Sequence, residues 1–458
     1  MTVVVSNRGP YRFVENADGS FGVRPAAGGL SSALRPLLTS GAAGEGASWV
    51  AAALSDSDRA AIRAGAVDAP GIGLHLLDLD PALQRLHYDI VSNQVLGFLH
   101  HGLFDLVRRP RFDHRFREAW RAYDEVNQTF ARAVTALADE NDAVLVQDYH
   151  LALVPGYLSK ARPDLRVVHF THIPFCGPNS IRVLPTAVAE ALCASMASVP
   201  CGFHAERWAK AYQASAREVL GNDTAAPVFV APLGPHAEQL EATASSDEAV
   251  AAGREIDALV GDRSLIVRSD RIDPAKNIVR GFLAYDLLLA AHADLRERVV
   301  FLALLNASRE SLPEYQAYHQ EVETAAARVN ERWRTPAWEP IVVDTRDDFT
   351  QTTAALKRYN VLVVNSIKDG LNLVAKEGPL LNERNGVLCL SPDAGAWDEL
   401  AGAALAIHPF DIEQSAAALY EGLTMPDEER NARAEALRAR AAARTPRDWL
   451  DNQLSQAS

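Results

Sequence analysis

The sequence has little cysteine and no long apolar run. Its four cysteines, at positions 176, 193, 201 and 389, form no C-x-x-C pair in 458 residues. We therefore expect no disulfide framework and a reduced, cytoplasmic setting. No stretch of ~18 consecutive apolar residues occurs, so we expect no membrane span. The N-terminal MTVVVSNR lacks the basic region and apolar core of a signal peptide, and we expect none.

Positive charge is also in short supply. There are 45 lysines and arginines against 59 aspartates and glutamates, which gives a net charge of −14. A nucleic-acid partner needs a basic surface and is therefore not expected. The 27 glycines and 24 prolines are too few for a low-complexity or collagen-like chain. Neither a G-x-G-x-x-G fingerprint nor a P-loop occurs, which disfavours a dinucleotide site and a Walker-type site.

What the sequence does contain is short apolar runs that alternate with helical patterns, such as those over 114–138 and 412–442. Continuous Val and Leu runs are typical of strands buried on both faces of a parallel sheet. This alternation predicts an α/β fold with doubly wound sheets. The predicted strands are 2–6, 143–147, 166–171, 227–231, 265–269, 299–305, 361–365 and 387–391.

These strands are too many for one sheet of ordinary size, so we expect two domains. A boundary is predicted where the PLGP segment at 232–235 precedes a small, polar stretch, ATASSDEA. The expected domains are Rossmann-like and cover residues 1–235 and 236–458. The segment at 445–458 carries one large apolar residue, Trp449, and is a candidate to pack back on the N-terminal domain.

Polar residues follow most of the predicted strands, at the strand ends where open α/β sheets bind ligands. One such residue alone is more often a loop or cap residue, but here the pattern recurs in both halves. We therefore expect the strand ends of two domains to face each other across one deep cleft that holds a phosphorylated ligand. The strand-end residues are Arg8, Asp148, His172, Asp270, Arg271, Lys276, Arg309 and Asp369.

Two glycine-containing segments are candidate ligand loops. Asp369-Gly370 provides a turn before a predicted helix, whose N-terminus would bind phosphate and whose Glu377, two turns in, would accept from ribose hydroxyls. The alternative is an ordinary buried helix with a surface glutamate. Gly28-Gly29 would let backbone approach a ligand closely, and a plain turn is the alternative.

Two further motifs contain residues typical of metal sites, but their sequence context argues against a metal. Asp78-Leu79-Asp80 has the D-x-D spacing of a metal-binding motif, yet its Leu-Leu and Pro flanks favour a solvated loop. His100 and His101 are adjacent, and adjacent residues on a helix do not face each other. No carboxylate–histidine spacing supports zinc, so we expect no metal site.

Seven segments in one order resemble the trehalose-6-phosphate synthases, and the resemblance covers nearly the whole chain. It implies a retaining glycosyltransferase of the GT-B fold that uses a nucleotide-diphosphate sugar and a sugar phosphate, without a metal or other cofactor. The segments are SNRGP, AAGGL, SNQVL, VQDYHLALVP, HFTHIPF, RSDRIDPAKN and DGLNLVAKE.

The resemblance also implies roles for individual residues. Catalysis is assigned to Asp148, which orients the acceptor, to His172 beside the transferred ring, and to the diphosphate-binding Arg271 and Lys276. The implied donor site consists of Gly28, Gly29, Arg271, Lys276, Asp369, Asn372, Leu373 and Glu377. The implied acceptor site consists of Arg8, Tyr88, Asp148 and Arg309.

Departures from the family pattern lie near the acceptor. Gly97 stands where the family has an aromatic residue, and Cys176-Gly177 follows HIPF. With the stretch SNQVLGFLHHGLFD, these departures resemble a pseudo-glycosyltransferase branch of the family. That branch implies coupling of GDP-valienol to validamine 7-phosphate through a C–N bond, with retention, in validamycin-type antibiotic biosynthesis.

Two alternatives stay open at this point. One is a trehalose-6-phosphate synthase that uses a nucleotide-diphosphate glucose and glucose 6-phosphate and tolerates Gly97. The other is an inactive homologue that binds sugar phosphates and regulates a partner. The sequence leaves the nucleotide base and the oligomeric state undecided, with a homodimer among the alternatives.

Overall fold

The computed structural model describes residues 1–26, 28–41 and 46–457. The chain forms two compact units, Met1–Leu233 with Pro446–Ser458 (unit 1) and Gly234–Thr445 (unit 2). The chain therefore leaves unit 1 after residue 233 and re-enters it at residue 446. Within the described residues, no helix combines the length and the apolarity needed to cross a membrane.

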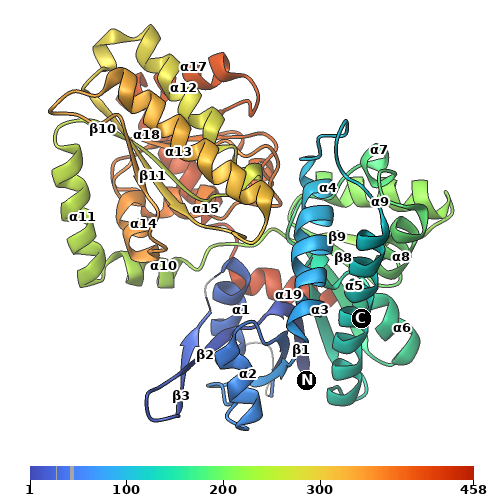
Figure 1. The fold of residues 1–458 in the computed structure, drawn as a ribbon. Helices are drawn as coiled ribbons and strands as arrows, with labels where there is room; N and C mark the ends of the chain where they lie inside the picture. The colour runs from blue at the N-terminus through green and yellow to red at the C-terminus, as the bar shows by residue number, and fades with distance from the viewer. Residues whose placement is uncertain (27, 42–45, 458) are drawn as a thin grey trace. The chain divides into compact units, whose positions relative to one another are not determined.

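Unit 1 is built on a parallel sheet with strand order β5-β4-β1-β6-β7-β8-β9 (Figure 1). The first strand lies inside the sheet and the chain winds outward from it on both sides, which is the Rossmann strand order extended by one strand. A separate antiparallel hairpin joins β2 to β3. The strands are β1 Thr2–Arg8, β2 Tyr11–Glu15, β3 Phe21–Pro25, β4 Ser48–Ala52, β5 Gly73–Leu77, β6 Ala143–Gln147, β7 Arg166–Thr171, β8 Cys201–Phe203 and β9 Val228–Val230.

Helices cover both faces of this sheet, whose central strands are apolar over most of their length. Val5 of β1 and Val146 of β6 are fully buried, and Phe130 of α5 packs in the same cluster. The helices are α1 Gly29–Thr39, α2 Asp56–Arg63, α3 Pro81–Arg85, the π-helix η1 Leu86–Gly97, α4 Phe98–His101, α5 His114–Leu137, the 3₁₀ turn η2 Tyr149–Leu151, α6 Val154–Ala161, α7 Pro178–Ile181, α8 Thr186–Met196, α9 Glu206–Leu220 and α19 Pro446–Gln456.

Helix α19 completes unit 1 although it lies at the end of the chain. Trp449 is 1% exposed, with its ring 5.2 Å from that of Phe170 and 5.6 Å from that of His172. Figure 1 shows α19, in red, beside the blue α1. The large apolar side chain of this segment, a candidate to pack back on the N-terminal domain, is therefore part of the core next to β7.

Unit 2 has a second parallel sheet, with strand order β12-β11-β10-β13-β14-β15. This is again the Rossmann order. Its strands are β10 Ser264–Arg271, β11 Val299–Asn306, β12 Ile341–Asp344, β13 Val361–Val364, β14 Val387–Leu390 and β15 Leu405–Ala406. Its helices are α10 Ala237–Ala244, α11 Asp247–Val260, η3 Pro274–Lys276, α12 Ile278–Ala291, η4 Ala293–Leu295, α13 Pro313–Trp333, α14 Phe349–Leu356, α15 Val374–Leu381, α16 Trp397–Leu400, α17 Ile412–Thr424 and α18 Asp427–Ala441.

The predicted α/β class with two Rossmann-like sheets is confirmed, and one helical prediction needs correction. The pattern over 412–442 forms two helices, α17 and α18, rather than one. Pro426 lies between them, and a proline has no N–H to continue the ladder of the preceding helix. Met425 has φ −57° and ψ 132°, the extended conformation that a following proline favours.

Candidate functional site

Each sheet has one point at which the strand order reverses, between β1 and β6 in unit 1 and between β10 and β13 in unit 2. Ligands of open α/β sheets bind beyond the carboxyl ends of the strands at these points. Arg8 ends β1 and Asp148 directly follows β6, whereas Arg271 ends β10 and Asp369 follows β13. The strand order therefore brings these four predicted residues to the reversal points of the two units.

Asp148 has an unusual backbone and an oriented carboxylate. Its φ of 73° and ψ of 164° are rare for a residue with a side chain, and such strain concentrates at functional sites. Its Oδ1 accepts a hydrogen bond from the backbone N–H of His172 at 3.1 Å, and Nδ1 of His150 lies 3.5 Å from Oδ2. The carboxylate is thereby held beside His172.

His172 is a neutral side chain held on both ring nitrogens. Nε2 lies 2.9 Å from Oε1 of Gln147, and Nδ1 lies 3.1 Å from Nε2 of His204. Burial, with a smaller contribution from His169, lowers the pKa of His172 to about 3. At neutral pH His172 therefore offers hydrogen bonds and ring surface rather than positive charge.

The π-helix η1 carries the predicted acceptor residue Tyr88. The Tyr88 ring stacks on His150 with centroids 5.3 Å apart and an interplanar angle of 11°. The hydroxyl of Tyr149 donates to Oδ1 of Asn93, which also lies on η1, at 2.8 Å. π-helical turns are rare and frequently occur at functional sites. Arg8, also predicted for the acceptor, is exposed at the end of β1.

Gly97 ends η1 in an ordinary helical conformation, with φ −59° and ψ −49°. A Cβ added there would lie 3.4 Å from the carbonyl oxygen of Ser92 and 4.0 Å from the hydroxyl of Tyr149. These are normal contact distances. Neither the backbone conformation nor the available space at Cβ therefore requires glycine at this position.

In unit 2, Lys276 and Asp369 form an ion pair of 2.5 Å. The same carboxylate oxygen accepts from Oγ of Ser366 at 3.3 Å and Nδ2 of Asn372 at 3.1 Å. Burial lowers the pKa of Lys276, but the carboxylates of Asp369 and Asp270 outweigh this effect and the pKa is raised. Lys276 is therefore a cation at neutral pH, next to the exposed Arg271.

Asp270, which was predicted only as a strand-end residue, and Lys376, which was not predicted, are two buried charged side chains of this region. Asp270 accepts from Nη2 of the fully buried Arg268 at 2.7 Å, and burial raises its pKa despite that pair. The Lys376 side chain is 0% exposed and lies 2.8 Å from Glu399. Asp270 was visible as a strand-end acid, but its buried partner lies on the same strand and carries no sequence signal.

The predicted phosphate-binding helix is α15, which begins at Val374. Oδ1 of Asn372 accepts from the backbone N–H of Ala375 at 3.1 Å, and Asn372 itself has φ 77°. Leu373 precedes the helix as its N-cap residue. The side chain of Asn372 therefore already occupies one of the backbone donors at this helix start.

Glu377 lies in the first turn of α15, so the prediction that it lies two turns in was wrong. The helix begins later than the motif suggested, because the Gly-Leu-Asn segment is an irregular loop. Burial raises the pKa of Glu377 to about 7. Across residues 1–26, 28–41 and 46–457, no side chain donates a hydrogen bond to its carboxylate.

The predicted donor site and the predicted acceptor site each contain residues from both units. Gly28, with φ 129°, and Gly29, the first residue of α1, lie in unit 1, whereas the other predicted donor residues lie in unit 2. Arg309 lies in unit 2, where Nη1 donates to Asp273 and to the Tyr315 hydroxyl at 2.7 Å each. Its predicted acceptor partners lie in unit 1. The grouping of these residues stays a prediction.

The two motifs that resembled metal sites have structural roles. Asp80 caps α3 by accepting from two of its backbone N–H groups, and Asp78 lies 3.6 Å from Arg59. Nδ1 of His100 accepts from the backbone N–H of Cys176 at 3.2 Å. In the part of the chain that the structure describes, no three His, Cys, Asp or Glu side chains are placed to hold a metal ion.

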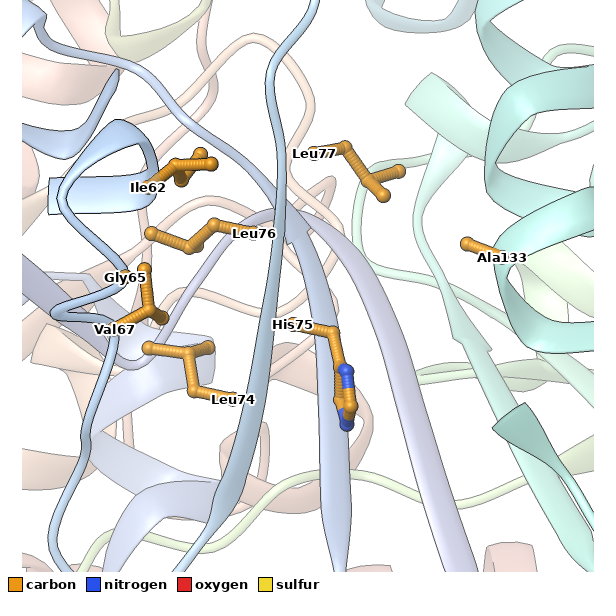
Figure 2. Close-up of a pocket in the computed structure, with 8 residues that line it drawn as sticks. All are labelled: Ile62, Gly65, Val67, Leu74, His75, Leu76, Leu77 and Ala133. Carbon is orange, nitrogen blue, oxygen red and sulfur yellow. The ribbon is translucent and has the colours of Figure 1, made fainter. Parts of the chain in front are cut away.

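A hollow of about 370 Å³ runs beside the edge strand β5, as Figure 2 shows. Its one titratable side chain is His75, whose pKa burial lowers. It contains none of the predicted site residues, so it does not account for the strand-end chemistry. Its lining residues are Ile62, Gly65, Val67, Leu74, His75, Leu76, Leu77 and Ala133.

Known proteins resemble the chain over its whole length. α,α-Trehalose-phosphate synthase [UDP-forming] A of Dictyostelium discoideum is 29% identical over 98% of the chain and 61% of its own length. Validamine 7-phosphate valienyltransferase of Streptomyces hygroscopicus subsp. jinggangensis is 29% identical over 89% of the chain and 84% of its own length. The chain thus spans 49–62% of the length of several curated trehalose-phosphate synthases that it matches.

Solved structures agree with these relatives. The α,α-trehalose-phosphate synthase of Burkholderia vietnamiensis has a TM-score of 0.84 and 27% identity, and the match covers 100% of this chain and 99% of that one. The trehalose-6-phosphate synthase of E. coli bound with UDP-2-fluoro glucose has a TM-score of 0.84 and 26% identity, with 100% and 98% covered. The fold is therefore GT-B. The model of glycosyltransferase family 20 matches residues 1–458, and the chain belongs to that family.

Proposed function

We propose that the protein is a retaining pseudo-glycosyltransferase that couples GDP-valienol to validamine 7-phosphate. The family relationship supports a transfer from a nucleotide-activated donor to a phosphorylated acceptor. The valienyltransferase relative, which is as similar as the trehalose-phosphate synthase of D. discoideum, supports the cyclitol substrates.

Gly97 is the observation that carries this proposal. A glycine in the middle of a helix lowers the stability of the protein by about 0.5–1 kcal/mol relative to an alanine. The helical backbone at residue 97 has room for a Cβ, so the fold gains nothing from the glycine there. We therefore attribute the glycine to the shape of the acceptor. In the trehalose-6-phosphate synthases, an aromatic ring at this place would form one side of the acceptor pocket.

The reaction begins at the donor. The bond between the allylic carbon of the cyclitol and the diphosphate oxygen breaks, and the ring double bond delocalises the positive charge that a sugar would share with its ring oxygen. Arg271, Lys276 and the start of α15 stabilise the negative charge that develops on the leaving diphosphate. Preorganised charge at the place where charge develops is usually the largest catalytic term.

The acceptor completes the reaction on the same face of the ring. Its amine forms the C–N bond as the diphosphate departs, and the departing phosphate oxygen takes the amine proton. Retention then needs no protein nucleophile. Asp148, whose carboxylate is held beside His172, orients the acceptor, and the neutral His172 lies against the transferred ring without repelling the cation.

A product assay tests this proposal. The purified protein is supplied in parallel with GDP-valienol plus validamine 7-phosphate and with a nucleotide-diphosphate glucose plus glucose 6-phosphate, and the products are identified by mass spectrometry. We expect validoxylamine A 7′-phosphate from the first pair and little or no product from the second. Efficient formation of trehalose 6-phosphate alone would refute the proposal.

Trehalose-6-phosphate synthesis is the second candidate. It is favoured by the names of the relatives that match at 29% identity over nearly the whole chain, and by solved structures with TM-scores of 0.84. It would use the same strand-end residues but a different donor and a different acceptor. The same assay separates the two candidates, since only one of them requires an amine nucleophile.

A further inference from the structure

A chain of hydrogen bonds runs through His172 in unit 1, and its direction can be deduced. It begins at the backbone N–H of Leu233, which lies 3.3 Å from Nδ1 of His204. A backbone N–H can only donate, so Nδ1 of His204 accepts and carries no proton. The proton of neutral His204 must then be on Nε2.

The next links follow from this one. Nε2–H of His204 donates across 3.1 Å to Nδ1 of His172, so the proton of His172 is on its Nε2. That N–H donates to Oε1 of Gln147 at 2.9 Å, and Nε2 of Gln147 donates to Oε1 of Gln453 at 2.9 Å. Each of these four bonds joins a donor to an acceptor, and all four point the same way. Nε2 of Gln453, at the far end, is buried and has no hydrogen-bond partner among the residues that the structure describes.

The two ends of this chain lie in the segments that connect unit 1 to the rest of the protein. Leu233 is the last residue before the chain leaves the unit, and Gln453 belongs to α19, with which the chain returns. Gln147 and Gln453 are both 0% exposed, so water does not compete for their amide groups. A buried amide pair of this kind fixes the orientation of both side chains.

We propose that His204, Gln147 and Gln453 are positioning residues that hold His172 as the neutral Nε2–H tautomer with its ring fixed. Protonation of His172 would place a hydrogen on Nδ1 against the N–H of His204, and this clash agrees with the lowered pKa of His172. The catalytic consequence rests on the proposed role of His172 beside the transferred ring. The tautomer itself does not depend on that role.

The test uses full-length protein labelled with ¹⁵N at histidine, in which long-range ¹H–¹⁵N spectra report the protonated ring nitrogen. The His172 signals are assigned by their loss in His172→Ala. In the wild-type protein we expect His172 and His204 both to be Nε2–H tautomers between pH 6 and 8. An Nδ1–H tautomer of His172, or a doubly protonated ring at pH 6, would overturn the proposal without reference to any substrate.

Variants on α19 test the far end of the chain. Gln453→Leu removes the acceptor for Gln147, so the amide of Gln147 is no longer held against the His172 ring. We expect kcat to fall ~10-fold or more with the donor KM nearly unchanged, because a small misplacement of a reacting group is costly. Gln453→Glu keeps an acceptor for Gln147 and should restore kcat. Gln456→Leu makes the same replacement one turn further along α19 and should leave kcat unchanged.

The outcomes also separate this proposal from the proposed function. If Gln453→Leu unfolds the protein, as thermal melting would show, the wild-type and Gln453→Glu spectra still decide the tautomer. A folded Gln453→Leu protein with an unchanged kcat would overturn the positioning role of Gln453 and Gln147. The kinetic comparison uses whichever donor and acceptor pair the protein turns over, so a different substrate does not affect it.

Discussion

The ammonium of Lys276 lies 2.5 Å from the carboxylate of Asp369, although 93 residues separate them in the sequence. The lysine that we assign to the donor diphosphate is thus paired with a protein carboxylate. A diphosphate that binds here must share Lys276 with Asp369 or take its place. The affinity for the nucleotide and the rate of transfer are therefore expected to respond differently to changes at this pair.

Asp369→Asn should raise the affinity for free nucleoside diphosphate several-fold while it lowers turnover. The amide removes a negative charge beside the diphosphate and leaves Lys276 available, but it also removes the carboxylate assigned to the hydroxyls of the transferred ring. Isothermal titration with GDP and with UDP measures the affinity. Lys276→Ala is the matched control and should weaken binding by ~10- to 10²-fold, since a charge-assisted hydrogen bond is worth ~1.5–3 kcal/mol. Weaker binding by Asp369→Asn would contradict this prediction.

Turnover should not depend on a divalent metal. In our proposal Arg271, Lys276 and the start of α15 stabilise the charge of the donor diphosphate, so a chelator has no essential ion to remove. We expect the same rate before and after EDTA treatment and gel filtration, measured with the substrates that the product assay identifies. Loss of turnover that magnesium restores would contradict the assignment and would return attention to Asp78 and Asp80.

Asp148→Asn and His172→Ala should each lower kcat by at least ~10²-fold, a loss typical of a removed positioning or electrostatic group. Asp148 lies at a strained strand end, and its carboxylate is tied to the backbone of His172. The fold should persist, as circular dichroism and melting would show. Near-wild-type rates in both folded variants would mean that the active site lies elsewhere.

Acid should destabilise the protein through three histidines whose pKa values are lowered in the folded state. Burial lowers the pKa of His87 and His169 to about 4 and that of His172 to about 3, from 6.5. The unfolded chain takes up these protons below pH 6.5 and the folded protein does not, so the stability they contribute is complete above pH 6.5 and is lost as the pH falls towards 4. Glu377 has the opposite dependence. Its pKa is raised to about 7, so the folded protein keeps a proton that the unfolded chain releases, and the stability that this group contributes is lost as the pH rises through 7.

Calorimetric unfolding at pH 5.5 in buffers of different ionisation enthalpy measures the proton balance. These four groups together should give an uptake of about two protons on unfolding, since the histidines gain almost three and Glu377 releases about one. Glu377→Gln should raise the uptake by about one proton. An unchanged uptake in that variant would show that Glu377 is ionised in the folded protein at this pH.

Most strands of continuous Val and Leu were predicted from the sequence, and even the three-residue β9 was among them. The short apolar run of β12 and several mixed strands were missed. β11 has seven buried residues from Val299 to Leu305, and such a continuous apolar run is typical of a strand that is covered on both faces of its sheet. β5, Gly-Leu-His-Leu-Leu, and β8, Cys-Gly-Phe, become strands only through pairing with neighbours that lie far away in the sequence. Local composition carries little trace of such pairing.

The candidate site likewise contains residues that the sequence identified and residues that it did not. Asp148 and Arg271 were identified because a charged residue after an apolar run marks a strand end. The hydrogen bond between Gln147 and Gln453 joins residues 306 positions apart, and neither amide stands out in its own segment. The start of α15 was misplaced because Gly370-Leu371-Asn372 forms a loop that a helix-like composition conceals.

A competition assay with the wild-type protein and Gly97→Trp tests the cyclitol coupling most directly. Both donors and both acceptors are supplied together, and the ratio of products is measured by mass spectrometry. We expect the wild-type protein to form validoxylamine A 7′-phosphate in large excess. Gly97→Trp, whose Cβ the backbone accommodates, should lose at least ~10-fold of that product, because the ring occupies the acceptor's place. An excess of trehalose 6-phosphate from the wild-type protein would contradict the account.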